Sequence, residues 1–194
     1  MDIWTWLALN FDLPILDWIS ENLWNPVLDA VMPVVTKLGD AGIFWIACAL
    51  VMIILPKTRK TGCAMGLALI MGLLLCNVTL KPLVARIRPY DFQLQEFQKI
   101  IPLLIEAEHD FSFPSGHTIA SLEASVALLL GNKKLGIPAV ILASVIAFSR
   151  LYLYVHYPTD VLFSILLGTA VAVLAKYLVT KGDTFYTNKK HTNR

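Results

Sequence analysis

The chain has 194 residues, a length that fits a single domain. Hydrophobic residues make up 57% of the chain and charged residues 15%, whereas a soluble domain is about 45–50% apolar and about 25% charged. This apolar surplus predicts a membrane protein. The formal net charge of +2 is small and the basic residues lie in short clusters, so we expect no nucleic-acid partner.

The first predicted element covers the stretch before residue 25, where aromatic residues mix with acids. This mixture is typical of a segment that lies in the membrane interface. The aromatic residues are Trp4, Trp6, Phe11, Trp18 and Trp24. The next element, residues 25–38, contains Asp29, Pro33 and Lys37, and we interpret it as a first, poorer membrane helix.

Five stronger apolar runs follow. A membrane-spanning helix needs about 20 predominantly apolar residues, with a range of about 17–25. The runs are Ala41 to Leu55, Gly62 to Leu80, Thr118 to Leu130, Ile137 to Tyr154 and Thr159 to Val179. With residues 25–38 they predict an all-α fold, a polytopic membrane bundle of about six transmembrane helices that forms one domain over residues 1–194.

The three cysteines, Cys48, Cys63 and Cys76, all lie inside these apolar runs. An odd number without paired spacing argues against a disulfide framework or a zinc site. We expect them to be small packing residues.

Basic clusters mark one end of the predicted bundle. They are Lys57, Arg59 and Lys60 after the first strong run, Lys133 and Lys134 after the third, and the tail from Lys181 to Arg194. Successive helices alternate in direction, so all three clusters fall on one side, which the positive-inside rule makes cytoplasmic. The opposite side carries the loop of residues 90–113, which is rich in Glu and Asp.

Polar and ionisable residues gather at the other ends of the same helices. They are Lys81, Arg86, Arg88, Ser115, His117, Arg150, His156 and Asp160. Ionisable residues in or near a membrane span are energetically unfavourable and mark functional sites. Because four helix ends bring them to the non-cytoplasmic side, they predict one shared site.

Three of these cations give the site its charge. Lys81, Arg88 and Arg150 suit a phosphate group, since Arg binds oxygens in a bidentate way and Lys acts as a point charge. A cation at a helix end also commonly reaches toward the lipid headgroups. This alternative stays open for Lys81, and we favour it for Arg86, which would point away from Arg88 on a helix.

The segment Pro114-Ser115-Gly116-His117 precedes an apolar helix, whose free N–H groups and dipole favour an anion. Gly116 allows a close approach of the backbone, and Ser115 adds a hydroxyl donor. Ser115 taken alone is equally well explained as a helix cap.

Two histidines beside a phosphate site suggest a nucleophile and an acid. Asp160 stands four residues after His156, and Pro158 between them prevents one continuous helix. A turn there would bring the carboxylate to one imidazole nitrogen and leave the other facing the phosphate. His117 would then protonate the leaving oxygen, although His156 taken alone also fits an interfacial residue.

Other titratable side chains receive no catalytic role. His109 lies in the acidic loop and His191 in the tail. Glu123 lies inside a membrane helix, about a turn and a half below His117, where it either pairs with a polar group or lines the pocket.

The polar residues form three motifs that resemble those of the type 2 phosphatidic acid phosphatase (PAP2) superfamily. Residues 81–89 match K-x6-R-P, residues 114–117 match P-S-G-H, and residues 149–160 match S-R-x5-H-x3-D. All three motifs are complete and in family order. The pattern of membrane helices extends the resemblance over residues 62–179.

The resemblance implies a PAP2-like helical core with its site at the extracytoplasmic face, and hydrolysis through a phosphohistidine without metal or other cofactor. Carried onto this chain, it makes His156 the nucleophile, Asp160 its orienting partner and His117 the general acid. The residues that would hold the phosphoryl oxygens are Lys81, Arg88, Ser115, Gly116 and Arg150.

Three function classes follow. The first is a lipid phosphatase acting on phosphatidic acid, phosphatidylglycerol phosphate or a polyprenyl diphosphate. The second is a vanadium-dependent haloperoxidase, which the apolar spans disfavour because those enzymes are typically larger and soluble. The third is a non-catalytic lipid-binding or transport protein, which the complete motifs disfavour. We favour undecaprenyl diphosphate as the substrate, in a bacterial plasma membrane, and leave the oligomeric state open.

The loop ahead of the P-S-G-H motif carries apolar residues at near-helical spacing. They are Phe92, Phe97, Ile100, Ile101, Leu104 and Ile105. Either this stretch lies in the interface and guides lipid headgroups into the site, or it is a simple surface loop.

Overall fold

A computed structural model describes the backbone of residues 1–192 and the side chains of residues 1–183. The described residues are helical with irregular connections and contain no strand, which confirms the all-α prediction. The helices in chain order are α1 (Ile3–Leu7), η1 (Ala8–Asp12), α2 (Leu13–Leu23), α3 (Pro26–Lys37), η2 (Asp40–Gly42), α4 (Ile43–Ile54), α5 (Arg59–Leu73), η3 (Leu74–Leu80), α6 (Lys81–Val84), α7 (Pro89–Phe97), α8 (Gly116–Gly131), α9 (Lys133–Tyr152) and α10 (Pro158–Thr192).

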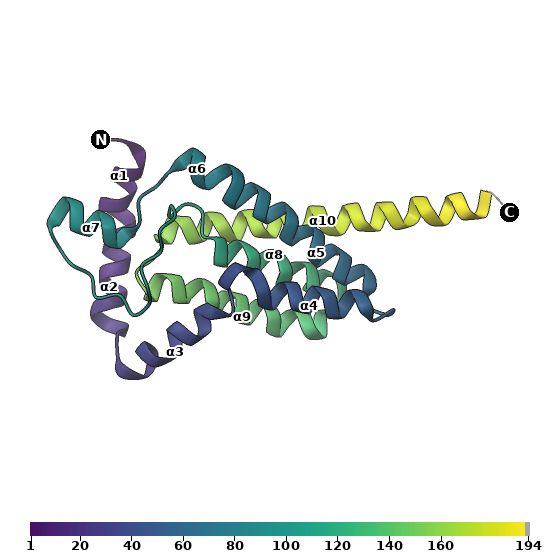
Figure 1. Cartoon of the computed structure of the whole chain (residues 1–194), viewed down its shortest axis with the longest axis horizontal. Helices are drawn as coiled ribbons and strands as arrows, with labels where there is room; N and C mark the ends of the chain where they lie inside the picture. Colours follow the sequence, from purple (N-terminus) through teal and green to yellow (C-terminus); the bar gives the residue numbers. More distant parts are fainter. Residues whose placement is uncertain (193–194) are drawn as a thin grey trace.

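The bundle is built around α8, which packs against α5, α9 and α10, while α4 covers α5 (Figure 1). The core between them contains Trp45 and Met65 together with several alanines, such as Ala124 and Ala143. Alanine lets helix backbones approach closely, and close packing takes the place of the hydrophobic effect between helices in lipid. The buried position of α8 therefore follows from its small residues.

Three segments of the described chain are long and apolar enough to cross a membrane, namely Arg59–Phe97, Lys133–Tyr152 and Pro158–Asp183. A fourth is obtained if Pro26–Lys37 and Asp40–Ile54, which are bent by 43° at their junction, form one span. The predicted number of about six is not confirmed. Two of the predicted helices form this bent pair, and α8, with 16 residues, is only about 24 Å long against a hydrocarbon layer of about 30 Å.

The bend between α3 and α4 has a backbone cause. Ala41 and Gly42 both have left-handed conformations, with φ of 49° and 66°. This conformation lies directly before α4 and prevents one continuous helix, and it is unfavourable for a side-chain-bearing residue. The two predicted helices of residues 25–38 and 41–55 therefore exist, but they meet at an angle.

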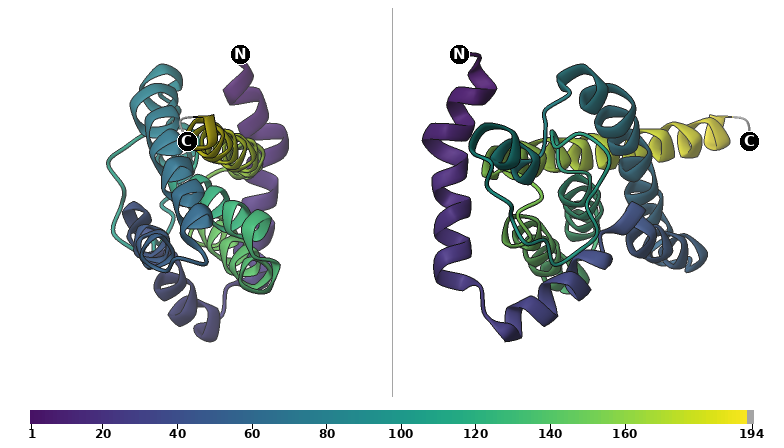
Figure 2. Two further views of the ribbon diagram at one scale, coloured as in Figure 1. Left: turned by 90° about the vertical axis from the view of Figure 1, so that its right-hand side faces the viewer. Right: turned by 60° about the vertical axis from the view of Figure 1, so that its left-hand side comes forward.

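The helix from α1 to α2 runs crosswise over one end of the bundle (Figures 1 and 2). Its buried face, which includes Leu16 and Ile19, packs on Tyr152 at the end of α9 and on Val155 just after it. Trp24 Nε1 donates a 2.9 Å hydrogen bond to the carbonyl of Tyr152. A crosswise helix with Trp6 and Trp18 exposed fits the predicted interfacial segment, which stays a prediction.

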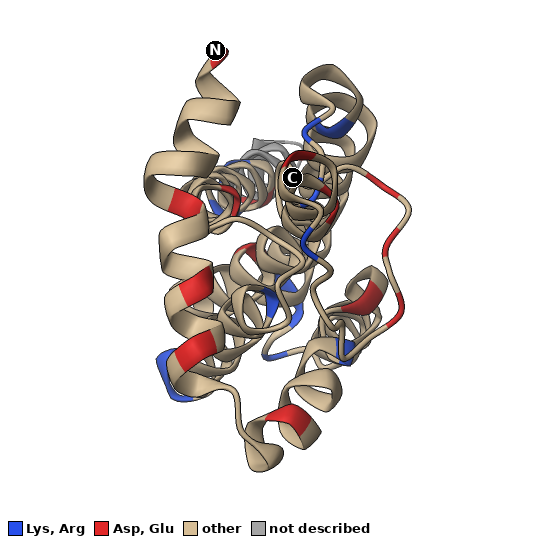
Figure 3. Ribbon diagram, turned by 90° about the vertical axis from the view of Figure 1, so that its left-hand side faces the viewer, with Lys and Arg blue, Asp and Glu red and all other residues tan. Residues whose placement is uncertain are grey.

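The two ends of the bundle differ in charge. The basic connections α4–α5 and α8–α9 lie at one end, and the motif-bearing helix ends lie at the other (Figure 1). At the motif end, acidic residues lie along the crosswise helix and along the loop after α7 (Figure 3). Residues 181–192 of the predicted basic tail continue α10, but Lys189, Lys190, His191 and Arg194 lie outside the residues whose side chains are described.

The loop ahead of α8 is helical only in its first part. α7 ends at Phe97, because Gln98 is left-handed with φ of 54°. Beyond it, Ile101, Leu103 and Ile105 pack in part against the cluster under the crosswise helix. Phe97, Ile100 and Leu104 remain exposed, so guidance of headgroups stays a hypothesis for these three side chains.

Two glycine substitutions test the origin of the bend. We expect Gly42→Ala to lower the free energy of unfolding by about 1–2 kcal/mol, because alanine is strained at positive φ. Gly66→Ala is the control: it lies inside α5, where its new methyl would meet no atom closer than 4.0 Å. It should stabilise the protein by about 0.5–1 kcal/mol. Thermal unfolding in detergent checks both, and shifts of the same sign would contradict the explanation.

Candidate active site

Three buried cations from separate elements converge at the motif end of the bundle. Lys81 starts α6, Arg88 caps α7 and Arg150 lies in the last turn of α9. Their exposed fractions are 8%, 1% and 0%. The structure therefore brings together the three cations that the sequence predicted for one anion site, and we name them the cation cradle.

His156 lies beside this cradle, in the turn between α9 and α10. Its Nδ1 lies 3.5 Å from Asp160 Oδ2, and its Nε2 lies 3.4 Å from Arg88 Nη1. Pro158 begins α10, so the chain turns where the sequence predicted and Asp160 falls in the first helical turn. One ring nitrogen thus faces a carboxylate and the other faces the cradle.

The environment of His156 favours its neutral form. Burial lowers the pKa of the imidazole well below its usual 6.5, and the neighbouring Arg88 and Arg150 lower it further. A neutral imidazole keeps a free electron pair on one nitrogen, which a nucleophile requires.

Asp160 is held in place by partners that the sequence did not reveal. Ser112 Oγ donates a 2.5 Å hydrogen bond to Asp160 Oδ2, and the backbone N–H of Tyr157 donates to the same oxygen at 3.0 Å. Ser112 Oγ also lies 3.5 Å from His156 Nδ1. Nothing in the sequence points to Ser112, because its position depends on the irregular loop before α8.

Arg86 does not reach toward headgroups, and that prediction was wrong. Its side chain is buried and pairs with Asp12 at 2.7 Å and with Asp160 at 2.5 Å. The guanidinium carbon also lies 3.7 Å from the centre of the Tyr157 ring. The prediction assumed a continuing helix, whereas Ala85 is left-handed and turns the chain inward after α6.

His117 also has a carboxylate partner. Its Nε2 lies 2.7 Å from Oδ1 of Asp40, in the break between α3 and α4. The imidazole packs so closely on Gly39 that a β-carbon there would lie 2.6 Å from His117 Cδ2. Asp40 was missed by the sequence reasoning, although it is an acidic residue at the end of a predicted helix.

Ser115 and Gly116 hold different positions at the start of α8. Ser115 caps the helix: its hydroxyl bonds to Thr118, and its backbone N–H donates to Ser164 Oγ. Its side chain is fully buried, so in this structure its hydroxyl serves the helix. Gly116 lines the cavity next to the cradle.

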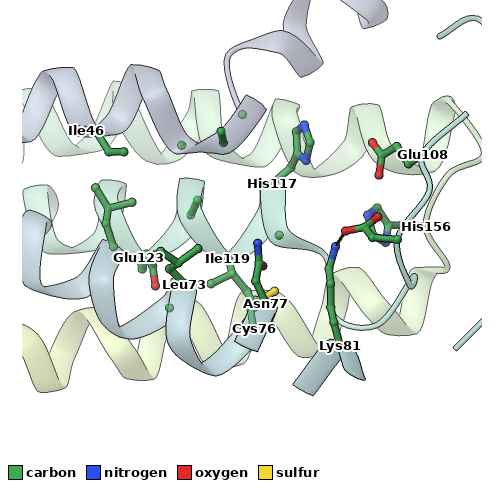
Figure 4. A pocket seen from close by; sticks show the side chains of 18 of the residues that line it. Ile46, Leu73, Cys76, Asn77, Lys81, Glu108, His117, Ile119, Glu123 and His156 are labelled. Atoms are coloured by element: carbon green, nitrogen blue, oxygen red, sulfur yellow. Dashed lines mark hydrogen bonds and ion pairs between the residues drawn. The ribbon is translucent and has the colours of Figure 1, made fainter. Parts of the chain in front are cut away.

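A cavity of about 650 Å³ extends from Lys81 of the cradle into the bundle interior (Figure 4). Lys81, His156 and His117 line its polar end. Its other end is lined by apolar side chains, including Ile46 and Leu73, and by Glu123. Of the two alternatives given for Glu123, the structure supports lining the cavity. No described residue makes a hydrogen bond to its Oε2.

The cradle is filled by two carboxylates from the acidic loop. Glu108 pairs with Arg88 at 2.5 Å and with Arg150, and Asp110 pairs with Lys81 and Arg88. Burial raises the pKa of both carboxyls, but the cations outweigh it and lower each to about 2. The sequence predicted an acidic loop on this side without predicting its entry into the site.

The contribution of the Asp12–Arg86 ion pair to stability is testable. We expect Asp12→Asn to lower the free energy of unfolding by about 3 kcal/mol or more, because it removes one carboxylate from a buried ion pair. Activity should fall as well, since Arg86 also contacts Asp160. Glu21→Gln, an exposed acid on α2, is the control and should change stability by less than about 0.5 kcal/mol. Equal melting temperatures for the two variants would contradict the stabilising role of the Asp12–Arg86 ion pair.

Comparisons with known proteins agree with the motifs. Residues 61–183 match the model of the PAP2 superfamily. An undecaprenyl-diphosphatase of Sulfolobus acidocaldarius is 30% identical over 175 residues, covering 90% of this chain and 81% of that protein. Undecaprenyl-diphosphatase BcrC of Bacillus subtilis is 31% identical over 150 residues, covering 77% and 74%. The crystal structure of a transmembrane PAP2 type phosphatidylglycerolphosphate phosphatase from Bacillus subtilis matches with a TM-score of 0.67, at 28% identity over 92% of each chain. The chain therefore belongs to the PAP2 superfamily and is a membrane phosphatase.

Proposed function

We propose that this phosphatase hydrolyses the phosphate ester or diphosphate of a membrane lipid, with undecaprenyl diphosphate as the favoured substrate. One observation carries the proposal: at one end the cavity is lined by Lys81, by His156 and by Glu108, which pairs with the other two cradle cations, and at the other end it is lined by apolar side chains. Such a cavity suits a molecule that is anionic at its head and apolar behind it. Two relatives named undecaprenyl-diphosphatase support the choice, and the named activity of the similar crystal structure makes phosphatidylglycerol phosphate the second candidate.

In the proposed mechanism, Nε2 of His156 attacks the phosphorus while Asp160 holds the proton-bearing Nδ1. The bond from phosphorus to the leaving oxygen breaks, and His117 donates a proton to that oxygen. Water then attacks the phosphohistidine, with His117 as the base, and releases phosphate. Arg88 lies beside Nε2, the attacking nitrogen of His156. This contact supports a position for the phosphoryl group at that side of the imidazole ring.

Positive charge in this mechanism comes from side chains. Lys81, Arg88 and Arg150 would balance the charge of the phosphoryl oxygens, as preorganised cations do in other phosphoryl-transfer sites. Gly116 would donate its backbone N–H, at the start of α8, to a phosphoryl oxygen. Ser115 would need to turn its hydroxyl away from Thr118 to donate to a phosphoryl oxygen as well. We propose that hydrolysis requires no metal ion.

We further propose that the site faces the extracytoplasmic side of a bacterial plasma membrane. The basic connections α4–α5 and α8–α9 lie at the end of the bundle opposite the cradle. The positive-inside rule supports a cytoplasmic position for that basic end.

Phosphate release by purified protein from a panel of lipid monophosphates and diphosphates, with a chelator present, tests the function. We expect release that survives chelation and falls by about 10³-fold or more in His156→Ala, because the nucleophile is lost. Acid-labile labelling of the protein by a substrate with a radioactive terminal phosphate should disappear in the same variant. Binding without turnover would point to a lipid-binding protein, and activity lost on chelation would contradict the metal-free mechanism.

Single-cysteine variants test the proposed sidedness. In a chain with Cys48, Cys63 and Cys76 replaced by alanine, a membrane-impermeant maleimide added to intact cells should label Glu106→Cys in the acidic loop. Lys134→Cys, in the α8–α9 connection, should react only after the membrane is opened. The reverse pattern would place the site in the cytoplasm.

A further inference from the structure

The junction between α3 and α4, residues 36–42, lies against His117, the proposed acid. Nε2 of His117 lies 2.7 Å from Asp40 Oδ1. The imidazole also fits closely against Gly39, because a β-carbon at that position would lie 2.6 Å from His117 Cδ2 and 3.0 Å from Ile146 Cγ2. The junction therefore holds the ring by its shape and by one polar contact, although it precedes all three motifs.

The same junction also contacts one cation of the cradle. Thr36 Oγ1 accepts a 2.5 Å hydrogen bond from Arg150 Nη1. The N–H of Gly39 donates to the carbonyl of Thr36 at 2.8 Å, and the N–H of Gly42 donates to the carbonyl of Gly39 at 3.2 Å. Because these hydrogen bonds fix the backbone on both sides of Asp40, its carboxylate keeps a defined place beside the site.

The contact with Asp40 decides which ring nitrogen of His117 can react. An ionised carboxylate only accepts hydrogen bonds, so Nε2 must carry a proton and donate it toward Asp40. Nδ1 is then the nitrogen that can exchange a proton with a substrate in the cavity that His117 lines. Asp160 and His156 divide these roles in the same way with the two nitrogens exchanged, since Nδ1 of His156 faces its carboxylate.

Three charged groups face His117 from three elements: Arg150 from α9, Asp40 from the junction and Glu108 from the acidic loop. Burial and Arg150 lower the pKa of His117 to about 4, whereas Asp40 and Glu108 raise it and so limit the decrease. A bound phosphoryl anion would raise this pKa further. A general acid must keep its proton until the leaving oxygen needs it, so the upward effect of Asp40 favours catalysis.

On the basis of the proposed function, we propose that Asp40 is a positioning residue that holds the Nε2 proton of His117, so that Nδ1 performs both proton transfers. In the first step the leaving oxygen keeps the electron pair of the broken bond to phosphorus and takes the Nδ1 proton, which leaves His117 neutral with its remaining proton on Nε2. In the second step Nδ1 takes a proton from water as the water oxygen bonds to phosphorus. The bond from phosphorus to His156 breaks, and its electron pair returns to Nε2 of His156.

The pH profile of kcat for the lipid that the unaltered protein hydrolyses fastest tests this role. In Asp40→Asn the pKa of His117 falls, so one limb of the profile should move to lower pH by about one unit. The alkaline limb moves if the first step limits turnover, because His117 loses its proton earlier, and the acidic limb moves if the second step does. KM should change by less than about twofold, since Asp40 does not touch the substrate. Unmoved limbs would overturn the inference.

Three further variants accompany Asp40→Asn. Asp40→Glu keeps the carboxylate and should restore most of the profile, whereas Asp40→Ser removes it again and should repeat the shift. Glu106→Gln is the matched control, since it removes one exposed negative charge at the same end of the bundle and should move neither limb. The side chain of Asp40 is 55% exposed, and exposed ion pairs contribute little to stability, so all variants should melt like the unaltered protein. An equal shift in Glu106→Gln would contradict a specific role for Asp40.

Two aryl phosphates separate an effect on the acid from a general loss of structure. Phenolate needs a proton to leave, whereas p-nitrophenolate leaves readily without one. In Asp40→Asn we therefore expect kcat/KM to fall by about tenfold for phenyl phosphate and by less than about twofold for p-nitrophenyl phosphate. Equal losses would overturn the inference.

The unaltered protein separates this inference from the proposed function. Phosphate release from no lipid of the panel would refute the proposed function itself. Lipid hydrolysis by the unaltered protein, together with an unshifted pH profile in Asp40→Asn, would refute the positioning role of Asp40 and leave the lipid phosphatase intact.

Discussion

The guanidinium of Arg86 connects the crosswise helix to the turn that carries His156, and the geometry of the candidate site depends on it. It pairs with Asp12 from η1 and with Asp160 from α10, both fully buried, and lies against the ring of Tyr157. A buried guanidinium is stable only with full pairing, so each partner must hold its position. Asp160 is thereby fixed on one side by Arg86 and on the other by the turn that carries His156. The N-terminal helix thus contributes to the site although the family motifs do not include it.

A second group of charges, the carboxylates of the acidic loop, covers the site on its outer side. The cation cradle concentrates positive charge in a buried place, and such charge needs anions at all times. The acidic loop supplies them through Glu108 and Asp110 when no substrate is bound. The same carboxylates reach the surface, so they stabilise the empty site without closing it. Under the proposed function an anionic substrate would exchange with these carboxylates, and its free energy of binding would be the difference between two sets of ion pairs.

Much of this arrangement could be predicted from residue types and their order. The apolar runs predicted the helices, and the alternation of helix direction brought the three motifs to one end. The Pro158 break predicted the turn that sets Asp160 beside His156, and the two side chains do lie together. The number of spans was not predictable in the same way, because the bend at Ala41 and Gly42 depends on two left-handed residues with no strong sequence signal. Arg86 was misplaced for a related reason: the left-handed Ala85 ends the helix on which the reasoning relied.

The sequence by itself determined the membrane class, the all-α fold, the family and the set of residues that gather at one end of the bundle. The family follows from the resemblance of three motifs, and the other properties follow from composition, periodicity and spacing, which are local along the chain. Only the tertiary structure decided which partner each charged group meets. Asp12 with Arg86, Asp40 with His117 and Glu108 with Arg150 are separated by between 42 and 77 residues. Their pairing depends on how irregular connections fold over the helix ends, because a buried charge takes whichever opposite charge the packed backbone brings within reach.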